Sequence, residues 1–171
     1  KWYSLQKFKV WKELKKNKIS KNWINKQRRD IYVRKSKLEG YRSRAIYKLK
    51  EIDDKFKIIR NGIKVVDLGS APGSWSQYLS EKSKNSKILS IDLKDIEKIH
   101  NVTHLIGDFL DEKNQTIISN FFEDKLDLIV SDMAVNTTGN KNLDAISTGE
   151  LSINAMEFSV KNLKKDGSFV S

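Results

Sequence analysis

The sequence of 171 residues contains no cysteine, which excludes a disulfide framework, a thiolate metal site and a cysteine nucleophile. It has no apolar run of about 18 residues, so no membrane-spanning helix is expected. The N-terminal residues are basic and aromatic without an apolar central region, and they show no secretory signal. The two histidines, His100 and His104, are poor joint ligands because a strand is predicted over 102–106, so no metal site is expected. These absences favour a cytoplasmic protein with no membrane partner.

Acidic residues are scarce in the first quarter of the chain. Residues 1–44 carry 16 lysines and arginines against three acids, a net charge of +13, whereas residues 45–171 carry a net charge of −2. A base bias in the genome would spread lysine evenly, so we interpret residues 1–40 as a basic, aromatic N-terminal extension and residues 41–171 as the folded domain.

Seven aromatic residues lie among the charges of residues 1–44. Cations that neutralise phosphates, beside rings that stack on bases, suit single-stranded or looped RNA. Alternatively, the rings pack on the core while the lysines stay solvated. RNA is favoured over a membrane surface because the segment forms no clean amphipathic helix. We expect RNA contacts from four cations near the domain boundary: Lys35, Lys37, Arg42 and Arg44.

Proline occurs once, at Pro72, inside the segment VVDLGSAPGSW of residues 65–75. Apolar residues lead into an acid and a glycine loop, and a polar, amphipathic segment follows. This order predicts a buried strand, a tight loop and a helix N-terminus, the arrangement that holds an adenine-containing cofactor at the carboxyl end of a strand. Gly69 and Gly73 permit positive φ and a close approach of ligand to backbone, while Pro72 stiffens the loop.

The spacing G-S-A-P-G differs from the dinucleotide fingerprint G-x-G-x-x-G, in which a helix N-terminus receives a pyrophosphate. S-adenosylmethionine carries no phosphate, so its loop needs only shape and backbone approach, and the spacing favours this cofactor over NAD. A purely structural strand-to-helix turn is the alternative. The cofactor contacts expected from this segment are Asp67, Gly69, Ser70, Pro72, Gly73 and Trp75.

Three further predicted strands also end in an acid. Asp92 lies about 20 residues past the loop, where ribose hydroxyls are usually bound. Asp108 is placed to accept a hydrogen bond from an adenine amino group, and Asp132 closes the fourth strand. A turn or helix-capping role would explain any one of these acids. Because parallel strands end at one rim of a sheet, we expect Asp67, Asp92, Asp108 and Asp132 to cluster there.

The apolar patterning predicts strands over 63–68, 87–92, 102–106 and 126–131, and helices over 43–55, 74–83, 113–123 and 147–164. Ser43 is expected to cap the first of these helices, and Gly167 to open a fifth strand. The alternation of strands and helices predicts an α/β fold with a doubly wound, mainly parallel sheet. Because the sequence begins without methionine and stops within a strand, we interpret it as part of a longer protein, truncated after the fifth strand.

From about residue 20 onwards, the chain resembles the FtsJ/RrmJ (RlmE-like) ribose 2′-O-methyltransferase family. The matching segments occur in the order and spacing of the family: GYRSRAIYKLKEID (40–53), VVDLGSAPGSWSQYL (65–79), SIDL (90–93), GDF (107–109), LDLIVSDMAVNTTG (126–139) and DGSFVS (166–171). The resemblance implies a Rossmann-like fold that binds S-adenosylmethionine. Ser70 and Ser74 stand where alanine and glycine are common in the family, and Val135 replaces a frequent proline.

The resemblance also implies a catalytic set, because family enzymes use a Lys-Asp-Lys-Glu constellation. Lys48 matches the first lysine and Asp132 matches the aspartate, which would also lie near the methionine end of the cofactor. The second lysine, regarded in the family as the base, would directly follow Ser171, with the glutamate further on.

The function that the resemblance implies is methylation of a ribose 2′-hydroxyl in 23S ribosomal RNA by a cytoplasmic monomer. Transfer RNA is the alternative substrate. A non-catalytic RNA-binding or ribosome-assembly factor that retains the fold is the rival from another class. A nicotinamide-dependent dehydrogenase is disfavoured by the G-S-A-P-G loop and by the basic extension.

Overall fold

The computed structural model describes residues 30–134 and 139–171, so most of the basic extension and Val135 lie outside the described residues. The chain divides into two compact units, Lys1–Gly40 and Tyr41–Ser171. In the first unit, α2 (Ile31–Leu38) begins after Asp30, whose carboxylate accepts hydrogen bonds from the backbone N–H groups of Tyr32 and Val33. This is a side-chain N-cap, which satisfies donors that a helix leaves unpaired at its start.

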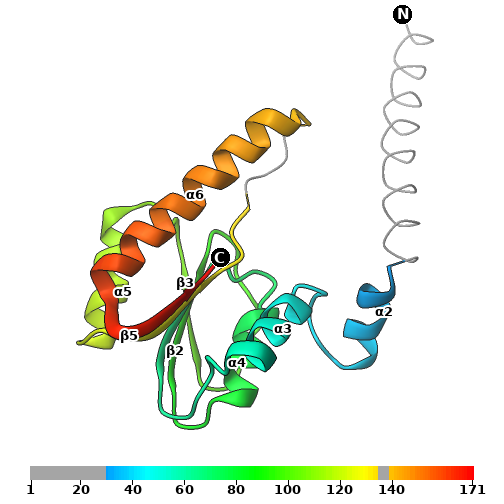
Figure 1. Ribbon diagram of the computed structural model, residues 1–171, viewed down its shortest axis with the longest axis horizontal. Helices are drawn as coiled ribbons and strands as arrows, with labels where there is room; N and C mark the ends of the chain where they lie inside the picture. The colour runs from blue at the N-terminus through cyan, green and yellow to red at the C-terminus, as the bar shows by residue number, and fades with distance from the viewer. Residues whose placement is uncertain (1–29, 135–138) are drawn as a thin grey trace, which may run out of the picture. The chain divides into compact units, whose positions relative to one another are not determined.

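The second unit is built on five parallel strands in the order β3-β2-β1-β4-β5 (Figure 1). The strands are β1 (Lys64–Leu68), β2 (Lys87–Asp92), β3 (Val102–Ile106), β4 (Leu126–Ser131) and β5 (Leu163–Val170). The prediction of an α/β fold with a doubly wound parallel sheet is confirmed. No helix within residues 30–134 and 139–171 is both long and apolar enough to span a bilayer.

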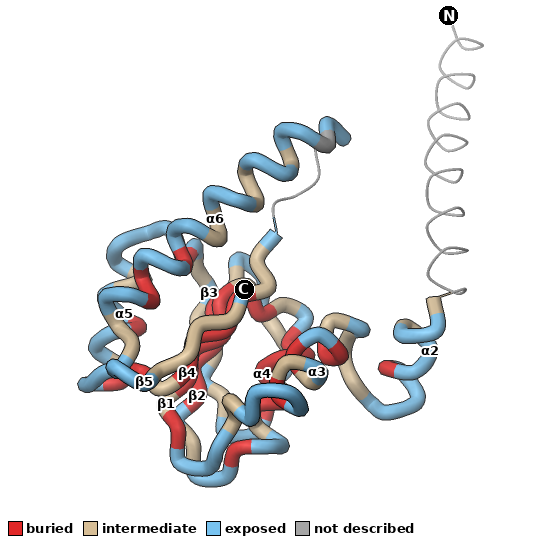
Figure 2. Tube along the Cα trace, viewed as in Figure 1, coloured by how far each residue is buried: buried red, intermediate tan, exposed pale blue. Residues whose placement is uncertain are grey.

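Helices cover both faces of this sheet, which is why its central strands β1, β2 and β4 are mainly apolar on both sides. Odd-numbered and even-numbered positions of β1 face opposite layers: Val65 packs in the cluster that includes α3 and α4, and Val66 in the cluster that includes α5 and α6. Figure 2 shows the buried residues concentrated along the central strands. The four helices are α3 (Ile46–Phe56), α4 (Ser74–Lys82), α5 (Glu112–Phe122) and α6 (Lys141–Asn162).

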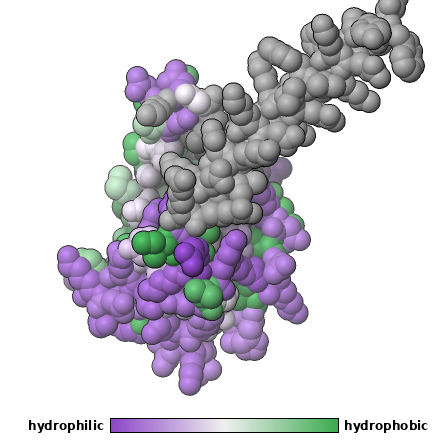
Figure 3. Space-filling model, turned by 90° about the vertical axis from the view of Figure 1, so that its right-hand side faces the viewer, coloured by the Kyte–Doolittle hydropathy of each residue, from purple (hydrophilic) through white to green (hydrophobic). Residues whose placement is uncertain are grey.

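On the face shown in Figure 3, hydrophilic side chains predominate and hydrophobic ones are scattered among them. Isolated apolar side chains of this kind are normal on a water-exposed surface.

The prediction that Ser43 caps the first helix of the domain was wrong. Helix α3 begins at Ile46, and its N-cap residue, Ala45, makes no side-chain capping bond. The Ser43 hydroxyl instead accepts a hydrogen bond from the Ala45 N–H and pairs with the Ser74 hydroxyl at 2.7 Å. The hydroxyl thus serves both the turn just before the helix and a tertiary partner on α4.

The boundaries around the last helix and strand also differ from prediction. Helix α6 starts at Lys141, six residues earlier than expected, because the Asn140 side chain accepts bonds from the N–H groups of Asn142 and Leu143. Strand β5 starts at Leu163, ahead of Gly167, because its pairing with β4 shifts register between Leu126 and Leu128. The polar residues in this irregularity concealed the start of the strand.

Candidate active site

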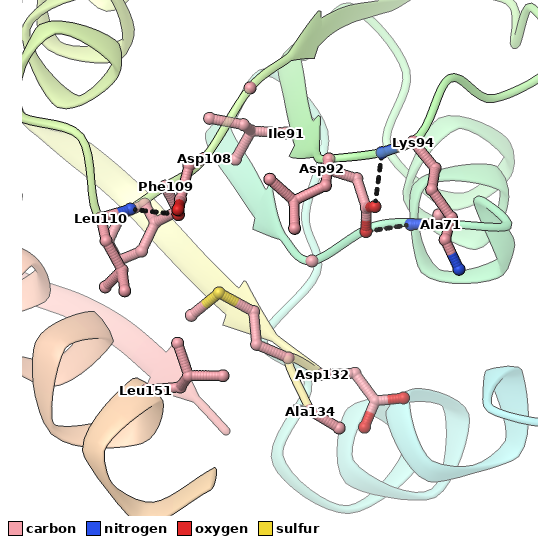
Figure 4. Close-up of a pocket in the computed structure, with 14 residues that line it drawn as sticks. Ala71, Ile91, Asp92, Lys94, Asp108, Phe109, Leu110, Asp132, Ala134 and Leu151 are labelled. Atoms are coloured by element: carbon pink, nitrogen blue, oxygen red, sulfur yellow. Dashed lines mark hydrogen bonds between the residues drawn. The ribbon is translucent and has the colours of Figure 1, made fainter. Parts of the chain in front are cut away.

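A cavity of about 450 Å³ opens at the carboxyl ends of β1, β2, β3 and β4. Its volume is typical of a small-molecule site, and its position obeys the rule that open parallel sheets bind ligands beyond their carboxyl ends. Residues at or just after the ends of these strands and one residue of α6 line it (Figure 4): Gly69, Ala71, Ile91, Asp92, Leu93, Lys94, Gly107, Asp108, Phe109, Leu110, Asp132, Met133, Ala134 and Leu151.

Asp92, the last residue of β2, is held in one orientation by two backbone groups. Its Oδ2 atom accepts a hydrogen bond from the Ala71 N–H at 2.9 Å, and its Oδ1 atom accepts one from the Lys94 N–H at 2.9 Å (Figure 4). Each carboxylate oxygen retains a further lone pair. The glycine loop and the β2 end therefore present an oriented acceptor pair to the cavity.

Asp108 occupies the corresponding place after β3. Its Oδ1 atom accepts from the Leu110 N–H at 2.9 Å, which closes a tight turn (Figure 4). The neighbouring Phe109 is buried and packs edge-on against Phe158 of α6, with ring centroids 5.3 Å apart. The turn is therefore fixed to the core, and it places a carboxylate beside apolar cavity walls.

Asp132, directly after β4, forms an ion pair with Lys48 of α3 across 84 positions of sequence. The Lys48 Nζ atom lies 2.7 Å from Asp132 Oδ1, and the two side chains are 66% and 33% exposed. An ion pair this open to water contributes little to stability. Its consequence is positional, because it holds an ammonium group beside a carboxylate that lines the cavity.

The glycine loop passes close to the residue that follows Asp132. Gly69 has φ 75°, and a Cβ atom at this position would lie 2.4 Å from Met133 Cγ. A side chain is therefore excluded both by backbone conformation and by space. Gly69 lines the cavity, while Ser70, Pro72 and Gly73 are not among the lining residues.

The expectation that four strand-end acids share one rim was wrong for Asp67. This residue lies within β1, not at its end, and its side chain is buried against α4, where the Ser76 hydroxyl donates to its Oδ2 atom at 2.6 Å. The other three acids, Asp92, Asp108 and Asp132, do meet at the cavity. Asp67 lies two positions after Val65 within the strand, so its side chain points to the same face of the sheet, toward α4.

Trp75 is placed in the core and does not line the cavity. Its indole is 4% exposed, and the Nε1–H group donates to the Ala45 carbonyl at 2.7 Å. Its position right after the glycine loop suggested a cofactor contact, but packing against α3 takes the ring away from the cavity.

Burial in the core raises the pKa of Asp67 to about 7 from an ordinary value of 3.8, and repulsion from Asp132 and Asp92 adds to the effect. The folded state therefore holds a proton that the unfolded chain releases above about pH 4. We expect the free energy of unfolding to decline from about pH 4 to pH 7 through this group, and Asp67→Asn to remove that component.

Urea denaturation of both proteins across this pH range measures the effect. The asparagine variant should gain stability relative to wild type as the pH rises, and the gain should level off above about pH 7. A stability difference that does not change with pH would contradict the assignment.

The four cations predicted to contact RNA fall in different settings. Lys35 and Lys37 lie on the last turn of α2 in the first unit, where Lys35 is 3.9 Å from Glu39. Arg44 is exposed in the second unit. The Arg42 guanidinium donates to three backbone carbonyls of the same unit, those of Pro72, Glu97 and Lys98.

Sequence reasoning missed the apolar part of the cavity. Leu93 and Leu110 each follow a strand-end acid by one or two positions, and their side chains stay exposed at 66% and 44%. Met133 and Leu151 complete this lining. The available signal in the sequence was a leucine one or two positions after a predicted strand-end acid.

The comparisons with known proteins agree with this geometry. A family model described as FtsJ-like methyltransferase matches residues 41–171. The ribosomal RNA large subunit methyltransferase E of Pelagibacter ubique (strain HTCC1062) is 60% identical over 158 residues, which cover 92% of this chain and 78% of that protein. The protein of the same name from Rickettsia akari (strain Hartford) is 46% identical over 172 residues, with 96% and 76% covered.

Among solved structures, a Plasmodium falciparum protein assigned as a ribosomal RNA methyltransferase superposes with a TM-score of 0.69 at 33% identity, covering 76% of this chain and 77% of that chain. The fold and the cavity thus define a Rossmann-like methyltransferase with three strand-end carboxylates at its binding site. The chain belongs to the FtsJ-like methyltransferase family, and the resemblance drawn from its motifs is confirmed.

Proposed function

We propose that this enzyme transfers the methyl group of S-adenosylmethionine to a ribose 2′-hydroxyl of 23S ribosomal RNA. The observation that carries the proposal is the Lys48–Asp132 ion pair, because it joins an ammonium group to the cavity that Asp92 and Asp108 also line. The relatives named ribosomal RNA large subunit methyltransferase E support ribosomal RNA as the substrate. The proposal includes a monomer that acts in the cytoplasm.

The chemistry of the cavity fits this methyl donor. Three carboxylates and a single ammonium group, that of Lys94, are among its lining residues. A lining of this sign attracts a cationic sulfonium and repels a pyrophosphate, which argues against a nicotinamide dinucleotide. The oriented oxygens of Asp92 suit the two hydroxyls of a ribose, and the apolar side chains of Leu93 and Leu110 suit the faces of an adenine ring. When bound, S-adenosylmethionine supplies a methyl group on a positively charged sulfur.

Lys48 and Asp132 then act on the RNA. Asp132 accepts one N–H of the Lys48 ammonium and so fixes its position. The remaining N–H groups are available to donate to the ribose 2′-oxygen or to the adjacent phosphate. This orients the oxygen for in-line attack on the methyl group, and alignment of this kind lowers a barrier by ~7–11 kcal/mol in favourable cases.

The 2′-hydroxyl must lose its proton as it attacks. We assign this proton to the lysine that the family resemblance places directly after Ser171. A lysine is a base near neutral pH only if its pKa falls well below the usual ~10.4. An ammonium group beside such a lysine would lower its pKa, because two like charges disfavour each other.

The direct test uses the full-length protein and S-adenosylmethionine labelled with tritium in its methyl group. Large ribosomal subunits, free ribosomal RNA and transfer RNA are offered in parallel. We expect label in the ribosomal RNA of large subunits or in the free ribosomal RNA, resistant to alkaline cleavage at the modified ribose. Label in transfer RNA alone would show that transfer RNA, and not ribosomal RNA, is the substrate. Cofactor binding without transfer to any RNA would favour a non-catalytic RNA-binding or assembly factor.

Asp92→Ala should weaken the affinity for S-adenosylhomocysteine by about 10- to 100-fold, because hydrogen bonds to a charged group contribute ~1.5–3 kcal/mol. The substitution also removes the acceptor that holds the Ala71 and Lys94 N–H groups. Isothermal calorimetry without RNA measures the effect. Asp95→Ala is the matched control, since that exposed carboxylate accepts a hydrogen bond from the adjacent Ile96 N–H and does not line the cavity. Equal affinities of Asp92→Ala and Asp95→Ala for S-adenosylhomocysteine would show that Asp92 does not bind the cofactor.

A further inference from the structure

Three contacts join the segment before α3 to the end of the glycine loop and the start of α4. Arg42 Nη1 donates to the Pro72 carbonyl at 3.2 Å, the Ser43 and Ser74 hydroxyls pair at 2.7 Å, and Trp75 Nε1–H donates to the Ala45 carbonyl at 2.7 Å. These six residues are called the clasp below. The three contacts occur in the same order along both segments, so residues 42–45 lie beside residues 72–75.

Arg42 extends the clasp to a third segment. Its Nη1 atom also donates to the Glu97 carbonyl at 2.8 Å, and Nη2 donates to the Lys98 carbonyl at 3.3 Å. This segment continues from Asp92 and Lys94, which line the cavity. A guanidinium is planar, always charged and rich in donors, and it can therefore bridge several carbonyls that a lysine cannot reach together.

The shape of the loop depends on the same guanidinium. Gly73 has φ 102°, and a Cβ atom there would lie 2.9 Å from Arg42 Nη1 and 3.1 Å from Ile99 Cδ1. The glycine loop therefore closes directly on Arg42. The cavity residues Gly69 and Ala71 belong to this loop, so Arg42 supports the binding site from behind.

The clasp also sets the start of α3. Helix α3 has no side-chain N-cap, and Ala45, its N-cap residue, is held by the Trp75 indole. Lys48 lies three residues further on, within the first turn of the helix. The position of its ammonium group relative to the cavity is thus tied to the loop that forms the cavity.

We propose that Arg42 is a positioning residue for methyl transfer, which through the clasp holds the cofactor loop in shape and sets Lys48 beside Asp132. This inference rests on the proposed function. We infer this role in place of the RNA contact expected from the sequence, because the guanidinium donates to three carbonyls of the domain. Loss of Arg42 should therefore affect the cofactor site even when no RNA is present.

The test compares Arg42→Met with wild type in the full-length protein. Calorimetry with S-adenosylhomocysteine, without RNA, should show an affinity about tenfold weaker, in line with lost charged hydrogen bonds. At saturating S-adenosylmethionine, kcat should fall about tenfold, because small displacements of a positioned group are costly. The dependence of RNA affinity on salt should keep its wild-type slope.

A phosphate contact would give the opposite pattern. Cofactor affinity would be unchanged, the KM for RNA would rise and the salt slope would fall by about one. That result would overturn the inference. Lys84→Met is the matched control: this exposed lysine lies between α4 and the amino end of β2, and its removal should leave all three measurements unchanged.

Two milder variants keep the inference testable if Arg42→Met does not fold. Arg42→Lys keeps the charge but loses the planar set of guanidinium N–H donors, so it should recover only part of the cofactor affinity. If Arg42 instead contacted a phosphate, lysine would restore that contact. Ser43→Ala removes one contact of the clasp and should weaken cofactor binding several-fold. Wild-type affinity and kcat in both would refute the clasp. If wild type itself transfers no methyl group, the proposed function fails, while calorimetry still decides whether Arg42 supports the cavity.

Discussion

Asp132→Asn is expected to lower kcat for methyl transfer by about 10³-fold, within the range found for groups that act on the reacting proton or its acceptor. The asparagine amide keeps the size of the carboxylate but removes the charge that faces Lys48 Nζ at 2.7 Å. The amide oxygen can still accept from the ammonium group, but a neutral hydrogen bond holds the lysine less firmly than the carboxylate does. Single-turnover transfer of labelled methyl to ribosomal RNA measures the loss.

The variant should fold, because an ion pair with side chains 66% and 33% exposed stabilises the protein little. Asp124→Asn is the matched control. This acid also pairs with a lysine, Lys64 at 3.2 Å, but lies before β4 at the opposite end of the strand. Its removal should leave kcat at the wild-type value. A wild-type kcat in Asp132→Asn would exclude the ion pair from catalysis.

Lys48→Met should lower kcat by about 10²- to 10³-fold and leave cofactor affinity unchanged. The separation of the two effects follows from the geometry: Lys48 reaches Asp132 but is not among the residues that line the cavity. Arginine should not restore the rate, since a planar guanidinium cannot occupy the place of a compact ammonium group. Calorimetry and single-turnover kinetics on the same preparation give both quantities.

The control for Lys48 lies on the same helix. Lys55 is exposed near the end of α3, where its Nζ atom is 5.1 Å from the centroid of the Phe56 ring. Lys55→Met should retain the wild-type rate. A fall in cofactor affinity with unchanged kcat in Lys48→Met would show that this lysine belongs to the binding site and not to the transfer step. The double variant with Asp132→Asn should be no slower than the slower single variant, because the two residues act as one unit.

The architecture of the domain followed from local patterns in the sequence. Strands buried on both faces of a parallel sheet are mainly apolar, so β2 and β4 were predicted with the bounds they have. The edge strand β3 is less buried, and its short apolar-rich segment still gave its bounds. The rule that ligands bind at the carboxyl ends of such strands then pointed to Asp92, Asp108 and Asp132, which the structure brings to one cavity. These features depend on residues that are near one another in sequence, or on a general property of parallel sheets.

The catalytic pairing needed more than these patterns. A lysine on an exposed helix face has no local feature that separates it from other surface lysines, and Lys48 was singled out only through the family resemblance. Its contact with Asp132 spans 84 positions and exists because α3 packs in the same apolar cluster as β4, the strand that Asp132 follows. The sequence alone contains no record of that packing.

The sequence by itself therefore determined the class of fold, the acids at the strand ends and the glycine loop. These features follow from the periodicity of side chains along a strand and from the positions at which strands end. Tertiary structure decided where the side chains went. It turned Asp67 into the core, where β1 continues past it, and it placed Trp75 against α3 and Arg42 on three backbone carbonyls. An acid, an indole and a guanidinium suit a ligand and a buried partner equally well, and only the position of the neighbouring elements selects between the two.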